Sequence, residues 1–331
     1  MPTNFPRPGS QQWFGLAKET TYGTPVATPT MWIPVDSPKW EPKVTPLVDQ
    51  ALRGMMGTDY GQAQGMRHDE LSYKTMIYAD TIFPHLMAIL GGTDTMTGTT
   101  PTVTHAVSLN NTSSSTLAGQ PSSYTGFLYQ LDGKVVQIPG MVISDLKITF
   151  KADTLPTVDA TWIGLPGAFI TAPTNTPSTL PPMPPFTATI TVGGVAATQY
   201  SDCSFDIKRS TAPVAVLNGT QSPLAIFAGP LSVSGSLLAI YQGTADTDLA
   251  ALLSNTQPTL SVALYQQGDA THPLTLQCSK IAYDSAAPAG SNTSFATIAT
   301  SFKALMNSTD ALDGKLSPIQ AKIINAQSTA Y

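Results

Sequence analysis

The chain has 331 residues, and its 16 Lys and Arg against 21 Asp and Glu give a formal net charge of −5. Only 11% of the residues are charged, whereas 28 Pro and 25 Gly separate short apolar runs, which is typical of a mainly β protein of two domains. The acidic balance excludes a tight binder of nucleic-acid backbones, and the absence of a run of roughly 18 apolar residues leads us to expect no membrane partner and synthesis in a cytoplasm.

The N-terminal third begins with a polar, Pro-rich stretch. We expect residues 1–31 to form an extended arm that docks outside its own domain through Trp13 and Phe14. A first β-domain, 32–165, then opens with strands whose prolines favour the edge of a sheet. Four glycines within 53–65 suit the flexible tip of a long hairpin.

Two stretches far apart in the chain repeat the same order of features. Residues 72–90 and 234–253 each contain an alternating apolar strand, then Ala-Asp-Thr, then a short helical pattern with Asp or Thr placed to cap it. A second matched pair, 144–151 and 201–208, shares Ser-Asp, alternating apolar positions and a closing Lys. Repetition of one unit indicates assembly more than catalysis.

Between these landmarks we expect a long loop after the first helix, including the Thr/Ser run 112–116, and then a row of strands. The strands expected in the first domain are 123–131, 134–138, 141–150 and 157–163. Seven prolines and no charge between 166 and 185 predict a semi-rigid linker that separates the two folded units.

The second domain, 186–306, repeats the inventory, and the remaining residues, 307–331, are expected to form a C-terminal arm. Its strands are expected near 186–192, 202–209, 231–241, 259–266 and 274–284, with a helix at 247–254 and an undecided strand or helix at 294–306.

The sequence offers little for catalysis. Cys203 and Cys278 lie in strand-like settings typical of small buried hydrophobes, with a disulfide as the alternative. His68 stands beside acids, but neighbours on a strand point to opposite faces and do not converge on a metal. Asp145 and Asp202 could be paired carboxylates, but their matching places in the repeat favour a structural role. We therefore expect no enzyme, no metal and no cofactor.

One segment carries a resemblance to a known family. The run Gly15–Thr30, which reads GLAKETTYGTPVATPT and is followed by an aromatic strand, resembles the opening of major tail tube proteins of long, non-contractile-tailed bacteriophages of the siphophage type. Gly140–Asp145 with the strand that follows, and the Asn218–Thr220 turn, extend the resemblance over most of the chain.

The resemblance implies two tandem β-sandwich or half-barrel domains, each with one short α-helix and a long hairpin, plus extended terminal arms. Their sheets would join edge to edge around a ring, so three chains would form a trimer with pseudo-sixfold symmetry. If the repeat is illusory, a hexamer is the second choice. Stacked rings would form a tail tube in the virion, made in the bacterial host cytoplasm, through which double-stranded DNA passes during genome ejection without specific binding. A tape measure protein and a tail terminator are the other implied partners.

Two sets of candidate site residues follow. A polar or acidic wall would avoid holding DNA phosphates. Candidate lumen-facing acids are Asp69, Glu70, Asp145, Asp202 and Asp206. Candidate contacts between rings or subunits are Trp13, Phe14, Tyr22, Met55, Met56 and Tyr60.

Other functions stay open at this stage. The main alternative is a β-sandwich adhesin or carbohydrate-binding module of a viral fibre or cell surface, although four Trp offer few aromatic platforms for sugars. A tail terminator or a baseplate-hub ring protein would share the same sequence features.

Overall fold

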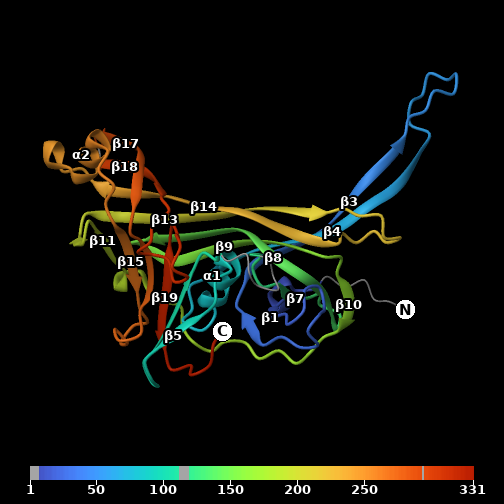
Figure 1. The fold of residues 1–331 in the computed structure, drawn as a ribbon, viewed down its shortest axis with the longest axis horizontal. Coiled ribbons are helices and arrows are strands. Elements are labelled where there is room, and N and C mark those ends of the chain that lie inside the picture. Colours follow the sequence, from blue (N-terminus) through green and yellow to red (C-terminus); the bar gives the residue numbers. More distant parts are fainter. Residues whose placement is uncertain (1–6, 112–118, 293) are drawn as a thin grey trace.

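The computed structural model describes residues 7–111, 119–292 and 294–331, and in this part the chain folds into two antiparallel sheets and two short α-helices (Figure 1). The fold is therefore mainly β, as the composition predicts. The larger sheet contains β1 (Phe14–Lys18), β2 (Met31–Ile33), β3 (Asp36–Asp49), β4 (Gly61–Met76), β7 (Tyr124–Tyr129), β8 (Lys134–Lys151), β9 (Thr154–Gly164), β10 (Ala168–Thr171), β13 (Tyr200–Val214), β14 (Ala225–Ile240), β17 (Ile281–Ser291) and β18 (Ser294–Ala304).

The smaller sheet has the strand order β12-β11-β15-β16-β19-β6-β5. Its strands are β5 (Thr95–Thr97), β6 (Val103–Ser108), β11 (Thr189–Val192), β12 (Val195–Ala197), β15 (Leu260–Leu264), β16 (Leu274–Cys278) and β19 (Gln320–Asn325). The helices are α1 (Ile82–Leu90) and α2 (Thr247–Ser254), with 3-10 turns η1 (Gly9–Gln11), η2 (Pro185–Thr187) and η3 (Gly243–Ala245). No helix in the described residues has the length and apolar character that crossing a membrane requires.

A continuous run of antiparallel strands dominates the larger sheet. In spatial order these strands are β3-β4-β9-β8-β13-β14-β18-β17, and they form the long platform that crosses Figure 1. The first half of β8 lies outside this run and pairs with β7 and β10. The apolar side of the platform faces α1 and the smaller sheet, and one hydrophobic core cluster joins them. This layering is a β-sandwich.

Both helices occur where the repeated pattern predicts them, but their caps differ. The Asp246 carboxylate accepts hydrogen bonds from the backbone N–H groups of Asp248 and Leu249, which satisfies the free start of α2. Thr81 precedes α1 without a capping hydrogen bond from its side chain. Helix α1 ends at Gly91, whose φ of 71° is the left-handed conformation that glycine adopts at little cost.

The two terminal segments fold onto the body instead of extending from it, which differs from the expected arms 1–31 and 307–331. β1 pairs with β2 and β7 inside the larger sheet. β19 lies between β16 and β6 in the smaller sheet, and the side chains of Ile319, Ala321 and Ile323 are fully buried. Burial of these alternating apolar residues holds each segment to its own chain. Residues 1–6 lie outside the described part.

The predicted linker and loop are also more structured than expected. Within 166–185, β10 pairs with β8 and the side chain of Met183 is fully buried, so this segment does not separate two bodies. The expected long loop contains β5 and β6, although its Thr/Ser run 112–116 lies outside the described residues. Cys203 and Cys278 are both buried free thiols, so the interpretation as small hydrophobes is correct and the disulfide is not formed.

The strand registers show that one unit occurs twice in the platform. In the hairpin β8–β9, a bulge between Ile143 and Asp145 shifts the pairing, and in β17–β18 the same shift lies between Tyr283 and Ser285. A second shift follows at the same spacing in both hairpins. The hairpins β3–β4 and β13–β14 share one bulge, between Val44 and Pro46 and between Arg209 and Thr211, whereas their other shift lies at different places; α1 and α2 follow β4 and β14. The order β3-β4-β9-β8 is therefore repeated by β13-β14-β18-β17.

This equivalence corrects one of the two matched sequence pairs. The stretches 72–90 and 234–253 do occupy equivalent places, in β4–α1 and β14–α2. The stretches 144–151 and 201–208 do not, because they lie in β8 and β13, which are neighbours that pair antiparallel with each other. Their similarity reflects matching charge patterns across one strand pair.

Candidate functional site

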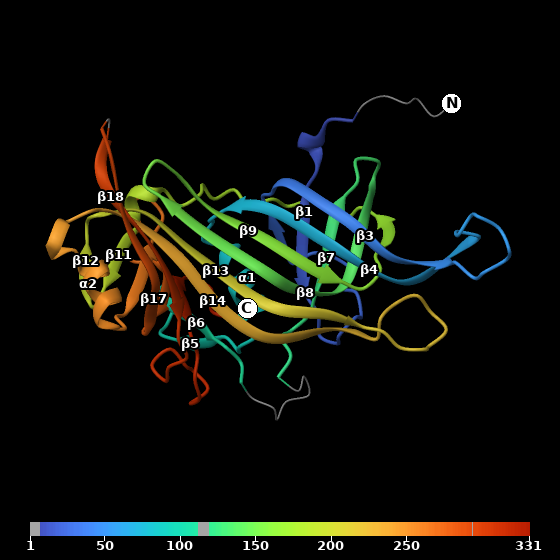
Figure 2. The same ribbon diagram turned by 90° about the horizontal axis from the view of Figure 1, so that it is seen from above.

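The platform has one polar face, and it is the most extended feature of the surface. Successive side chains of a strand point to opposite faces, so every second side chain packs into the core and the others lie on the opposite face of the platform. Figure 2 views this face, with α1 behind the strands, and in the described residues no helix or strand lies over it. The registers place the following charged residues there: Asp36, Lys39, Glu41, Lys43, Glu70, Lys74, Asp145, Lys147, Lys151, Asp159, Asp202, Asp206, Lys208, Asp284 and Lys303.

This set contains eight acids and seven lysines, which alternate across neighbouring strands. Asp145 lies 3.5 Å from the amine of Lys208, and Asp206 lies 4.0 Å from that of Lys147, so the β8–β13 junction carries crossed ion pairs. Exposed pairs of this kind contribute about 0–1 kcal/mol each to stability. Their main effect is therefore on the electrostatic potential of the face, because each acid offsets the charge of the lysine beside it.

The same balance extends to the outer strand β3. Hydrogen bonds from Lys43 and then Lys39 hold the pKa of Glu41 at about 2, so its carboxylate stays charged. Lys43 also lies 3.5 Å from Glu70 of β4. The lysines were missed in the sequence, although they recur at the same two-residue spacing as the acids that were singled out.

The candidate lumen acids divide into two groups. The structure brings Glu70, Asp145, Asp202 and Asp206 onto the polar face. Asp69 is wrong as a member of this set, because its side chain points to the opposite side and is 1% exposed.

Asp69 instead acts as a structural hydrogen-bond acceptor. Its carboxylate accepts hydrogen bonds from the indole N–H of Trp40, at 2.8 Å, and from the guanidinium of Arg67 and the backbone N–H of Gly167. These partners compensate the cost of burying the charge. Asp69 thereby ties β3, β4 and the start of β10 together.

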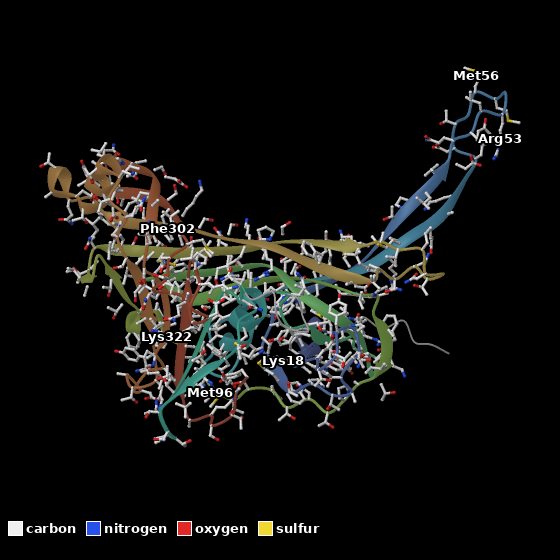
Figure 3. All side chains as sticks on the ribbon, in the orientation of Figure 1. Lys18, Arg53, Met56, Met96, Phe302 and Lys322 are labelled. Atoms are coloured by element: carbon white, nitrogen blue, oxygen red, sulfur yellow. The ribbon has the colours of Figure 1, made fainter. Side chains whose placement is uncertain are left out.

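The hairpin of β3 and β4 extends far beyond the body (Figures 1 and 3). Its tip holds Met55 and Met56, whose side chains are 74% and 102% exposed, beside the equally uncovered Leu52. The guanidinium of Arg53 lies 4.6 Å from the ring centre of Tyr60, which stiffens the base of the tip by a cation–π contact. An apolar cluster held away from the body is typical of a contact surface.

The remaining contact candidates pack against their own chain. Phe14 is fully buried, and Trp13 stacks on Tyr129 with 5.5 Å between ring centres. The hydroxyl of Tyr22 accepts a hydrogen bond of 2.6 Å from the backbone N–H of Ile226, so it joins the two units. As a contact to another subunit, Phe14 is wrong in this conformation because its own chain covers it, whereas Trp13 and Tyr22 are partly exposed and stay candidates.

One buried carboxylate, which the sequence analysis did not identify, holds the opening segment in place. Glu19 accepts hydrogen bonds from the backbone N–H groups of Gly23 and Gly140 and from the hydroxyls of Ser123 and Thr125, at 2.6–2.8 Å. It therefore fastens the opening segment to β7 and β8. The Glu-x-x-x-Gly spacing is the only local signal that could have indicated this role.

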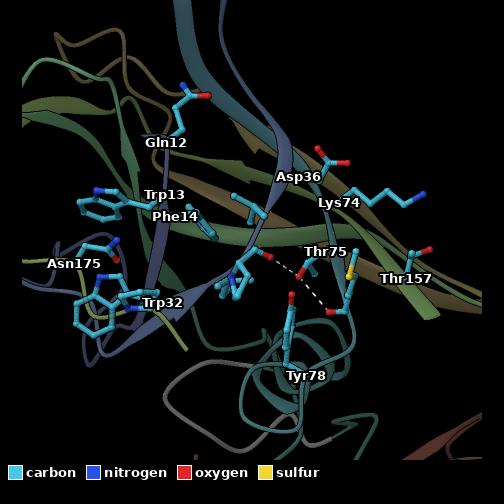
Figure 4. A pocket seen from close by; sticks show the side chains of 15 residues that line it. Gln12, Trp13, Phe14, Trp32, Asp36, Lys74, Thr75, Tyr78, Thr157 and Asn175 are labelled. Carbon is cyan, nitrogen blue, oxygen red and sulfur yellow. Dashed lines mark hydrogen bonds between the residues drawn. The ribbon is translucent and has the colours of Figure 1, made fainter. Parts of the chain in front are cut away.

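A hollow of about 320 Å³ lies beside this segment (Figure 4). Trp13 and Trp32 line it, and at its floor the hydroxyl of Thr75 donates to the carbonyl oxygens of Pro34 and Met76, at 2.6 and 3.1 Å. These contacts hold the β2–β3 connection against β4. The lining is mainly aromatic and apolar, which fits a packing junction.

Comparison with known proteins gives one family match. The family described as phage tail tube protein matches residues 9–304, which include every strand of the platform. No curated protein matches the chain.

Proposed function

The chain belongs to the phage tail tube protein family, so it is a structural component of the virion tail that assembles with itself into a tube, and from this premise we propose how it does so. Three chains form a ring with pseudo-sixfold symmetry, and rings stack into a tube of the siphophage type. Each chain supplies two four-stranded units to the wall of the bore. A hexamer of chains is the second arrangement.

The observation that supports this proposal is the duplicated platform. β3-β4-β9-β8 and β13-β14-β18-β17 share strand order, three of their four bulge positions and an attached helix, and they meet side by side at β8 and β13. A chain that already joins two equivalent units by strand pairing can join further units by the same contact. Closing the row into a ring removes the open sheet edges.

We place the polar face toward the bore. Double-stranded DNA that must slide would be held by a wall with excess Lys and Arg, because each phosphate contact adds electrostatic affinity. The alternating ion pairs, such as Asp145–Lys208 and Asp206–Lys147, give a wall whose charges nearly cancel. Of the polar or acidic wall that we expected, we propose a polar wall of nearly balanced charge, which keeps DNA mobile by offering little net attraction.

The long hairpin and its apolar tip serve the contact between rings, since they extend beyond the platform. The tape measure protein would occupy the bore before DNA does, and the tail terminator would close the tube. The function needs no catalysis and no cofactor, and assembly follows synthesis in the host cytoplasm.

Electron microscopy and sedimentation of the purified protein test this proposal. We expect rings and tubes with a hollow bore at high protein concentration. A protein that stays monomeric at every concentration and salt would contradict the proposal.

A further inference from the structure

The two outer strands of the platform, β3 and β17, are each paired on one side only in the described part of the chain. Resting on the proposed ring, we propose that β17 of one copy pairs antiparallel with β3 of the next, in the register that β8 and β13 show inside the chain. Because β8 is equivalent to β17 and β13 to β3, the internal junction is a template for the contact between copies.

The template defines the register residue by residue. Inside the chain, Asp145 of β8 lies opposite Lys208 of β13. The shared bulges make Ser285 the equivalent of Asp145. The bulge that follows Val44 in β3 and Arg209 in β13 makes Lys43 the equivalent of Lys208. Ser285 therefore lies opposite Lys43 of the next copy, and the strands stay antiparallel because the platform alternates direction throughout.

Backbone directions agree with this register. The N–H of Arg67 in β4 donates to the carbonyl of Gln221, so it points away from β3. Val44, which lies opposite Arg67, therefore directs its own N–H and C=O away from β4 and outward, and so do the alternate residues Pro42 and Trp40. In β8, the N–H of Ala152 donates to β13, so even-numbered residues of β8, and their equivalents in β17, also point outward. Both strands therefore present their free groups to each other.

Prolines occupy complementary places along this seam. The register sets Ala286 opposite Pro42 and Pro288 opposite Trp40, so no proline faces another. Each pair then keeps one N–H···O bond, donated by Ala286 and by Trp40. Prolines on an exposed edge hinder indiscriminate strand pairing, which protects the free subunit from aggregation. The matched register is the one that tolerates them.

Side chains agree as well. β17 presents the small residues Ala286, Ala287, Pro288 and Ala289, so the charged side chains of β3 meet no like charge across the seam. At the position that Arg209 occupies inside the chain, β3 has Val44, which is 38% exposed. It comes beside the end of α2, where Leu253 is 79% exposed. Both apolar side chains become buried in the seam.

Cysteine pairs test the register. Opposite residues of this kind have Cα atoms about 4.5 Å apart, which suits a disulfide. We expect the double variant Lys43→Cys with Ser285→Cys to form covalent dimers and trimers when the assembled protein is oxidised. The matched control, Asp145→Cys with Lys208→Cys, should close within one chain and leave its mass unchanged. The shifted pair Lys43→Cys with Ala287→Cys should give no covalent oligomers.

The outcomes separate this inference from the proposed function. Rings in the microscope without crosslinking of Lys43→Cys and Ser285→Cys, or with crosslinking of the shifted pair, overturn the register and leave the tube role intact. Failure of the wild-type chain to form rings overturns both. Hydrogen exchange is the second measurement: the amide protons of Trp40 and Ala286 should exchange at least tenfold more slowly in tubes than in free subunits, and equal rates contradict the seam.

Discussion

The charge balance of the polar face is open to a direct perturbation. Replacing Asp145, Asp202 and Asp206 by Asn keeps the shape of each side chain and removes three negative charges per chain. The lysines opposite them, on β8 and β13, then lose their partners. Each lost exposed pair costs about 0–1 kcal/mol, so the subunit should still fold and assemble.

The expected gain is in affinity for DNA. Freed lysines from several chains face the bore together, so contacts with roughly six to ten phosphates are within reach. Contacts of that number make binding fall by about 10³–10⁵-fold between 50 and 200 mM salt. Anisotropy of a labelled short duplex, measured with assembled tubes at both salt concentrations, would record this slope. Wild-type tubes should show weak binding with little salt dependence.

A matched control has the same change of charge elsewhere. Asp132, Asp269 and Asp313 lie in turns away from the polar face, and their replacement by Asn should leave DNA binding as in the wild type. Equal binding by the two triple variants would refute the assignment of this face to the bore. Strong, salt-dependent binding by wild-type tubes would refute the idea of a balanced wall.

Three further predictions concern stability and assembly. Burial lowers the pKa of His85 to about 4 from 6.5, so the neutral side chain contributes its full stability above pH 6.5, and about 3 kcal/mol of the free energy of unfolding is lost as the pH falls to 4. The urea midpoint of the wild type should therefore fall with pH more steeply than that of His85→Gln, and parallel pH profiles of the two proteins would contradict this. Arg209→Met removes hydrogen bonds to the last carbonyls of α1 and should lower the free energy of unfolding by about 2–4 kcal/mol, whereas an unchanged urea midpoint would rule out this role. The double variant Met55→Ser with Met56→Ser should leave rings intact but shorten tubes in micrographs, whereas Val195→Ser, at an exposed apolar site elsewhere, should leave tube length unchanged. Tubes of normal length from the double variant would exclude the tip from the contact between rings.

The local order of elements could be read from the sequence because it depends on short-range physics. The strand–helix pattern at 72–90 and 234–253 combines alternation, a helical period and a stop at Gly91, all visible within about twenty residues. The pairing of β8 with β13 could not be read in this way. Two similar strands can be equivalent or adjacent, and only the register separates these cases.

The sequence did not determine which face of the sheet a side chain occupies, or whether a terminal strand pairs with its own chain or with another. Asp69 and Glu70 are adjacent, and a shift of one residue exchanges the buried and exposed members of such a pair. β1 and β19 read as ordinary amphipathic strands, and nothing local states whether such a strand pairs with its own chain or with another. The fully buried Ile323 shows that its own chain supplies the partner.

In the proposed ring, the two equivalent units of each chain join those of its neighbours through their outer strands. Electron cryomicroscopy of assembled tubes, at a resolution that separates strands, tests it most directly. We expect three chains per ring, with β17 of each chain beside β3 of the next and the polar face lining the bore. Rings of six chains, or tubes whose chains touch only through the long hairpins and leave β3 and β17 unpaired, would contradict it.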